Sequence, residues 1–159
     1  MAILTEDMKR VVREQRLGFY ATVGADGTPN LSPKGTTAVW DDDHLFFAHI
    51  RSPQTVANLR RGSLVEINVV DPFVRKGHRF KGPAVIHEPG TAGFAAGVER
   101  LHQDGFTTPA ERVKAIVVVA VRQAHAVVSP AYDDGSRGES EVTRAWEDHF
   151  ARVRRPDRA

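Results

Sequence analysis

The chain has 159 residues, of which 41% are hydrophobic and 26% charged, and its formal net charge is +2 from 22 basic and 20 acidic side chains. These values are typical of one soluble globular domain, and so balanced a charge gives no reason to expect a nucleic-acid-binding protein. The absence of cysteine excludes disulfides, thiolate metal sites and cysteine nucleophiles.

The chain begins with the pattern of a short helix followed by an antiparallel hairpin. Thr5 can cap a helix over residues 6–15. Residues 18–40 alternate large apolar and smaller side chains around a turn at 26–27, which predicts two paired strands. Three consecutive aspartates, 41–43, follow the hairpin. They are interpreted as a solvated turn; a metal site is the less frequent alternative for such a triplet.

A strand over residues 44–50 leads directly into a second short helix, 53–61. Ser52 is a natural cap for this helix, and the proline after it suits the first helical position. Two more strands are expected over residues 63–70 and 78–87 because β-branched and aromatic residues dominate them.

The second half of the chain contains a helix over residues 91–104, a valine-rich run over 112–130 and a C-terminal helix at 139–153. The valine-rich run predicts one or two central strands, bent near Gln123. Short connections favour antiparallel pairing, and about six strands of this kind close most readily into a barrel. We therefore expect a single domain over residues 1–159, mainly β with flanking helices, built on a six-stranded antiparallel barrel.

The junction between the strand at 44–50 and the helix at 53–61 is the first candidate binding site. Ser52 and Thr55 would lie at the cap and the third position of a helix whose first backbone N–H groups have no partner within the helix. Such a terminus attracts anions, and Arg51 adds positive charge, so the segment can bind a phosphate. In the alternative interpretation Ser52 only caps the helix and Thr55 is a surface residue.

Two further segments combine glycine with positive charge. In NLSPKGTT (30–37), proline and glycine interrupt a strand, which indicates an edge, a bulge or the close approach of a ligand, and Lys34 adds a cation. In RKGHRFKG (75–82), Arg79 and Lys81 share one face of an extended chain. The alternatives are a kinked edge strand with an exposed lysine and a solvated basic surface. Nucleic acid is not the expected ligand, because the patch is short and lacks interleaved exposed aromatic residues.

The sequence favours neither a metal site nor a hydrolytic triad. The seven histidines are scattered singly and show no metal-ligand spacing with a carboxylate. No serine lies in the context of a nucleophile elbow. We therefore expect no bound metal and no serine hydrolase.

The sequence also predicts a cytoplasmic protein that does not associate with membranes. The N-terminal segment contains acidic residues and no long apolar core, unlike a secretory signal. The longest apolar run, AIVVVAV at 115–121, is far shorter than the ~20 residues of a membrane-spanning helix.

Three linked segments follow one another within residues 4–87: LGFYATVGADGTPNLSPKG, DDDHLFFAHIRSPQTVANLRRG and LVEINVVDPFVRKGHRFKGPAVI. In this order and spacing they resemble the pyridoxamine 5'-phosphate oxidase-like proteins, whose fold is the FMN-binding split β-barrel. The segment VVSPAYDDG (127–135) and the C-terminal helix also look like members of this group. Several linked motifs make the resemblance specific, whereas any one of them alone would not.

The resemblance implies a homodimer with two FMN sites at the subunit interface, each formed by residues of both chains. By position, the residues along the flavin ring and ribityl chain would be Ser32, Pro33, Lys34, Gly35, Thr36 and Thr37. Those holding the phosphate would be His49, Ile50, Arg51, Ser52, Gln54 and Thr55. Lys76 and Gly77 would lie near the ring. The polar junction after the strand at 44–50 is then the place where the phosphate docks.

One position departs from the family pattern. Many relatives carry a lysine where this chain has Gln54, so Arg51 or Lys34 would have to supply the charge. The resemblance implies a flavin-dependent oxidoreductase with a small-molecule substrate, in which Lys34 or Lys76 could stabilise the reduced, anionic flavin. Two alternatives stay open: a deazaflavin-dependent reductase on the same barrel, and a non-catalytic protein that binds or stores flavin.

Overall fold

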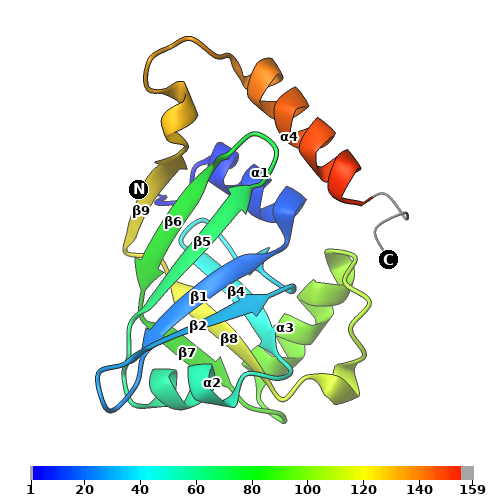
Figure 1. Cartoon of the computed structure of the whole chain (residues 1–159). Helices are drawn as coiled ribbons and strands as arrows, with labels where there is room; N and C mark the ends of the chain where they lie inside the picture. The colour runs from blue at the N-terminus through cyan, green and yellow to red at the C-terminus, as the bar shows by residue number, and fades with distance from the viewer. Residues whose placement is uncertain (1, 155–159) are drawn as a thin grey trace.

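The computed structural model describes residues 2–154. The strands are β1 (Gly18–Val23), β2 (Pro29–Lys34), β3 (Ala38–Val39), β4 (His44–His49), β5 (Val65–Asp71), β6 (Lys76–Gly82), β7 (Ala84–His87), β8 (Ala115–Ala120) and β9 (Gln123–Val128). The helices are α1 (Glu6–Gln15), α2 (Pro53–Arg60), α3 (Ala92–Gln103) and α4 (Glu139–Val153), with single 3-10 turns at Ala110–Arg112 and Pro130–Tyr132. All strand pairs are antiparallel, which confirms the predicted mainly β barrel with flanking helices (Figure 1).

The strands form one sheet in the order β2-β1-β5-β6-β9 and a second in the order β3-β4-β8-β7. Three of the predicted strand runs are each divided between the two sheets, at residues 35–37, at Pro83 and at residues 121–122. These bends carry the chain from one sheet into the other and so join the two sheets into a barrel. This is why hydrophobic alternation predicted about six strands where residues 2–154 form nine.

A glycine makes the bend between β6 and β7 possible. The chain crosses the end of β8 there, where the Ala120 N–H donates to the Pro83 carbonyl at 2.9 Å and the Arg122 N–H donates to the Lys81 carbonyl at 2.8 Å. A Cβ atom on Gly82 would lie 1.8 Å from the Ala120 carbonyl oxygen. Only glycine therefore allows the two backbones to approach this closely.

Helices close the two ends of the barrel interior. The N-terminal cap of α1 forms as predicted, because the Thr5 hydroxyl accepts a hydrogen bond from the Met8 N–H at 3.2 Å. From this helix Val11 and Val12 pack into the interior core. Leu59 of α2 packs into the same core, and Figure 1 shows the two helices at opposite ends of the barrel.

A second hydrophobic layer lies outside the barrel, under α3. Leu45 and Phe47 of β4 belong to the interior core, whereas Phe46 belongs to the layer that packs against Leu101 of α3. Both faces of β4 are therefore buried. This explains why its sequence is continuously apolar instead of alternating.

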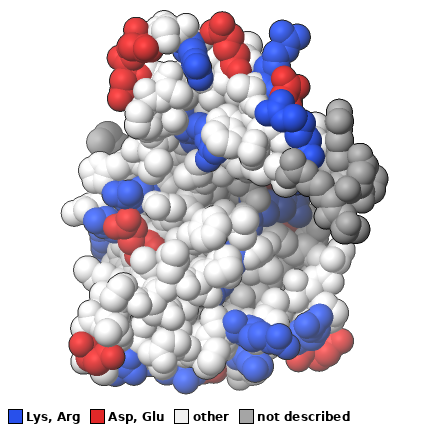
Figure 2. Space-filling model, in the orientation of Figure 1, with Lys and Arg blue, Asp and Glu red and all other residues white. Residues whose placement is uncertain are grey.

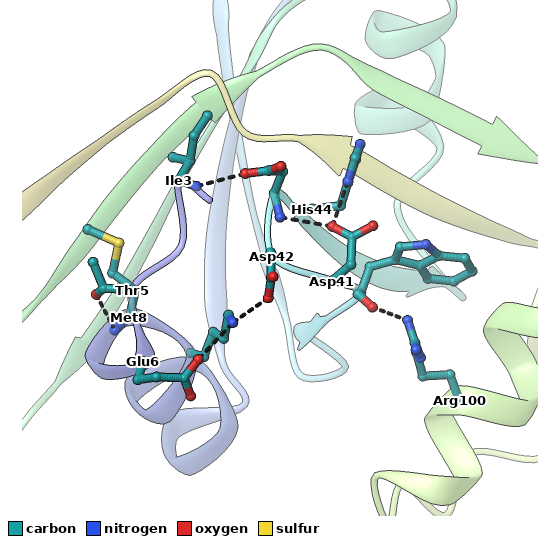
Figure 3. Close-up of polar contacts among 11 residues, drawn as sticks. Ile3, Thr5, Glu6, Met8, Asp41, Asp42, His44 and Arg100 are labelled. Carbon is teal, nitrogen blue, oxygen red and sulfur yellow. Dashed lines mark hydrogen bonds and ion pairs between the residues drawn. The ribbon is translucent and has the colours of Figure 1, made fainter. Parts of the chain in front are cut away.

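The three aspartates form the turn between β3 and β4, as the sequence predicts, and they fix the N-terminal segment to the barrel (Figure 3). The Asp43 carboxylate accepts a hydrogen bond from the Ile3 N–H at 2.7 Å, and the Asp42 carboxylate lies 2.5 Å from the Lys9 ammonium. The Asp41 carboxylate accepts from the Asp43 N–H at 2.8 Å. Each carboxylate of the triplet thus has a structural partner.

The C-terminal helix α4 lies against the turn between β5 and β6 (Figure 1). Phe150 packs edge-on against Phe73 with ring centroids 5.4 Å apart, and the Arg75 guanidinium lies 3.3 Å from the centroid of Trp146. No helix in the described part of the chain is long and apolar enough to cross a membrane. The single domain over residues 1–159 stays a prediction, and residues 1 and 155–159 lie outside the described residues.

Candidate functional site

One face of β2 carries polar side chains into the barrel, beside α2. Asn30, Ser32 and Lys34 occupy alternate positions and are half-buried or buried, whereas Leu31 and Pro33 between them are exposed. Together with side chains from the end of β4 and the start of α2 they form what we call the polar cluster. Its members are Asn30, Ser32, Lys34, His49, Ser52 and Thr55.

Lys34 is a buried cation in this cluster. It is 6% exposed, its ammonium donates a hydrogen bond to the Ser32 hydroxyl, and it lies 5.4 Å from the ring centroid of Phe47. Among residues 2–154 no carboxylate lies within ion-pair distance of it. Burial lowers the pKa of Lys34 to about 8. A buried charge without a counter-charge is unfavourable, so the position suits an anionic ligand.

The start of α2 presents several hydrogen-bond donors to the same space. Ser52 occupies the cap position, but its hydroxyl makes no cap hydrogen bond and lies 3.1 Å from His49 Nδ1. The expectation that the Ser52 side chain caps the helix is therefore wrong, because the ring at the end of β4 takes its hydroxyl. The first helical residue is Pro53, and the first bond of the turn runs from the Val56 N–H to the Ser52 carbonyl at 3.3 Å. The N–H groups at positions 54 and 55 are left without an intrahelical acceptor.

Thr55 is buried, contrary to the interpretation that made it a surface residue. It is 1% exposed, and its hydroxyl accepts a hydrogen bond from the Asn30 side-chain amide at 3.1 Å. The same amide donates to the Thr22 hydroxyl at 3.2 Å, which also accepts from the Asn58 amide at 3.0 Å. These bonds hold β2, β1 and α2 together. Thr22, Asn30 and Asn58 were not predicted as members of this network, although the polar residues at 30, 32 and 34 were a signal for the inner face.

Three cations and one carboxylate, Glu88, act on His49. Burial holds the pKa of His49 below its ordinary value, and the nearby cations Lys114, Lys34 and Arg60 lower it further. Lys114 is beside it because its N–H donates to the His49 carbonyl at 2.8 Å. The imidazole is therefore neutral at neutral pH, where its ring nitrogens can serve as hydrogen-bond partners.

The remaining residues of the two predicted segments fix the backbone or face solvent. The Thr36 hydroxyl accepts from the Ala48 N–H at 3.0 Å, and the Thr37 hydroxyl donates to the Lys34 carbonyl at 2.8 Å, so both threonines hold the bend after β2. Gln54 donates its side-chain amide to Asn58 at 2.8 Å. Ile50 is half-buried, and the exposed members are Pro33, Gly35, Arg51 and Gln54.

Lys76 and Gly77 lie elsewhere in the same chain. They border a cavity of about 380 Å³ beneath the start of α4, and the Lys76 ammonium lies 2.6 Å from the Glu139 carboxylate and 4.3 Å from the centre of the Tyr132 ring. Lys34 pairs with the first residue of β1, and β1, β5 and β6 follow one another in the sheet. Three strand spacings separate β2 from β6, roughly 14 Å. One chain thus brings segments 32–37 and 49–55 together but not residues 76–77.

The basic pair on β6, Arg79 and Lys81, shares one acidic partner. The Arg79 and Lys81 side chains lie 3.0 Å and 2.9 Å from the two carboxylate oxygens of Glu66 on the outer face of the five-stranded sheet. This arrangement agrees with the alternative interpretation of the segment as a solvated basic surface.

Comparisons with known proteins identify relatives of this arrangement. A family model described as pyridoxamine 5'-phosphate oxidase matches residues 4–128. HupZ of Group A Streptococcus is 31% identical, with a TM-score of 0.66 over 79% of this chain and 94% of that one. An FMN-binding protein of Syntrophomonas wolfei (15% identity, TM-score 0.63, 79% and 87%) and an F420 reductase (22%, 0.59, 76% and 98%) share the fold. Among curated proteins none matches the chain.

Proposed function

The chain belongs to the pyridoxamine 5'-phosphate oxidase family, and from this premise we propose that it binds FMN and is an oxidoreductase acting on a small molecule. The observation that carries the proposal is Lys34, which is buried with a lowered pKa and has no carboxylate partner among residues 2–154. An anionic cofactor would supply the missing counter-charge. Bound FMN would supply hydride and electron transfer, while the protein holds and orients it.

The start of α2 has the donors that a phosphate needs. A dianion leaves water only if several hydrogen bonds replace its hydration. The Ser52 and Thr55 hydroxyls belong to the cap and third positions of this helix, and the N–H groups at positions 54 and 55 have no acceptor within it. We assign the phosphate to these groups, with Arg51 at the exposed rim supplying charge. Residues 32–37 would then follow the ribityl chain and the ring, where Lys34 could stabilise a reduced, anionic flavin.

A homodimer would bring together the two groups of residues that one chain keeps apart. The outer face of β1 and β2 carries exposed apolar side chains, among them Phe19, Val23 and Leu31 at 44%, 52% and 64% exposure. Figure 2 shows this face as largely uncharged. Such a surface favours contact with another protein surface, and an isologous dimer is the commonest way to cover it. We propose that Lys76 and Gly77 complete the FMN site of the partner subunit.

The two alternative functions use the same barrel. A deazaflavin would need room and cations for a longer tail than FMN has, and a storage protein would bind FMN without catalysis. The visible spectrum of the purified protein separates FMN from deazaflavin and from an empty site. Reduction of bound flavin by NADH or NADPH in a stopped-flow experiment then separates an enzyme from a passive binder. A protein that binds no FMN when the cofactor is added in excess would refute the proposal.

A further inference from the structure

A second cavity borders Thr37, the last residue of the segment 32–37. Its volume is about 160 Å³, and it opens between the end of α1, the start of β3 and the loop that follows α3. The residues that line it are Arg13, Arg16, Thr37, Ala38, Asp104 and Phe106. A volume of about 150 Å³ is enough to hold a single benzene ring.

One wall of this cavity is a guanidinium stacked on an aromatic ring. Arg16 ends α1 in the left-handed conformation, with φ of 55°, and its carbonyl accepts a hydrogen bond from the Thr37 N–H at 3.2 Å. Its guanidinium donates to the carbonyls of Asp104 and Gly105 at 2.7 Å and 3.4 Å and lies 4.7 Å from the centre of the Phe106 ring. Backbone acceptors and the ring therefore fix this side chain, which still has N–H donors to spare.

The charges around the cavity are not balanced. Within residues 2–154, Arg13 has no carboxylate at ion-pair distance, and the bonds of the Arg16 guanidinium go to carbonyl groups. One carboxylate, Asp104, borders the cavity and pairs with neither arginine. Two cations against one anion attract a ligand with a single negative charge, and guanidinium groups bind planar carboxylates through paired hydrogen bonds.

We propose that this cavity binds a planar, single-ring carboxylate. The ring packs against Phe106 and Ala38, and the carboxylate accepts hydrogen bonds from Arg13 and Arg16. Because Thr37 ends the segment to which we assign the flavin, such a ligand would lie next to the cofactor as a substrate; only this last step depends on the proposed function. Binding of the carboxylate itself does not.

The test is calorimetric titration of the full-length protein with benzoate and with benzamide, its neutral isostere. We expect benzoate to bind at least tenfold more tightly than benzamide. The variant Arg13→Gln should weaken the binding of benzoate at least tenfold and leave the binding of benzamide unchanged. Arg10→Gln is the matched control, because Arg10 is on the same helix but pairs with Asp7 and Glu14 away from this cavity. Phe106→Ala should weaken the binding of both ligands by a similar factor.

Three results would overturn the proposal: no benzoate binding, equal effects of Arg13→Gln and Arg10→Gln, or tighter binding of phenyl phosphate than of benzoate. The spectrum of bound flavin in the same samples keeps the two proposals separate. Benzoate binding to a protein that takes up no FMN would support the cavity and refute only the cofactor. FMN binding without benzoate binding would refute only the cavity.

Discussion

Replacing Lys34 by methionine should stabilise the apo-protein and at the same time weaken its binding of FMN. Methionine keeps most of the length of the side chain and its contact with Phe47 but removes the charge. Burial lowers the pKa of Lys34 from 10.5 to about 8, so at neutral pH the folded protein holds an ammonium that its surroundings disfavour. Removing that charge removes the cost.

The sign and size of the effect follow from the lowered pKa. Since the folded pKa is below the unfolded one, the destabilisation is absent above about pH 10.5, grows as the pH falls, and is complete below about pH 8. One pKa unit corresponds to ~1.4 kcal/mol, so the lowering from 10.5 to about 8 corresponds to at most about 3.5 kcal/mol of destabilisation. Solvent screening of the ammonium reduces this, and we expect a net destabilisation of about 1–2 kcal/mol. At pH 7 this raises the Tm of apo-Lys34→Met by about 3–6 °C. At pH 10.5 the Tm values of the two proteins should converge.

Cofactor affinity should change in the opposite direction. An anion bound beside Lys34 favours the protonated form, so FMN affinity of the wild type should fall by up to about tenfold per unit as the pH rises above 8. Lys34→Met should bind FMN weakly and without this dependence, and Lys34→Arg should restore the affinity at high pH. Scanning calorimetry and fluorescence titration measure the two effects. A lower Tm for apo-Lys34→Met, or FMN binding equal to that of the wild type, would refute the reasoning.

Further outcomes follow from the structure. Ser52→Ala and Thr55→Val should each weaken the binding of FMN about tenfold to a hundredfold but leave the binding of riboflavin unchanged. Each change removes a hydroxyl bond to a charged group, which is worth roughly 1.5–3 kcal/mol. Equal losses of affinity for both ligands would place the phosphate elsewhere. Since the Ser52 hydroxyl makes no cap bond, Ser52→Ala should lower the Tm little. Gln54→Lys should tighten the binding of FMN but not of riboflavin, and unchanged FMN affinity would mean that the phosphate does not reach this position. Gly82→Ala should cost at least about 3 kcal/mol by urea denaturation, since its Cβ would meet the Ala120 carbonyl at 1.8 Å. Light scattering should find a dimer with FMN bound, and a monomer would contradict the shared site.

The elements of this fold, and the two segments of its candidate site that one chain brings together, could be predicted from the sequence. Helix α1 begins after Thr5 because a hydroxyl and the periodicity of the next ten residues act within a few positions of each other. Segments 32–37 and 49–55 could be named because their motifs resemble those of a family, and the structure brings them together. The phosphate assignment itself stays a prediction.

Contacts between distant residues decided the rest. The Ser52 hydroxyl turns to His49 instead of its own helix, and Thr55 is buried because Asn30, 25 positions earlier, binds it. The strand runs divide into nine strands where backbones from different sheets cross, as at Gly82 and Ala120. Propensity and periodicity act over one or two turns of chain, whereas burial, close backbone approach and the lowered pKa of a lysine arise only when segments far apart in sequence pack together.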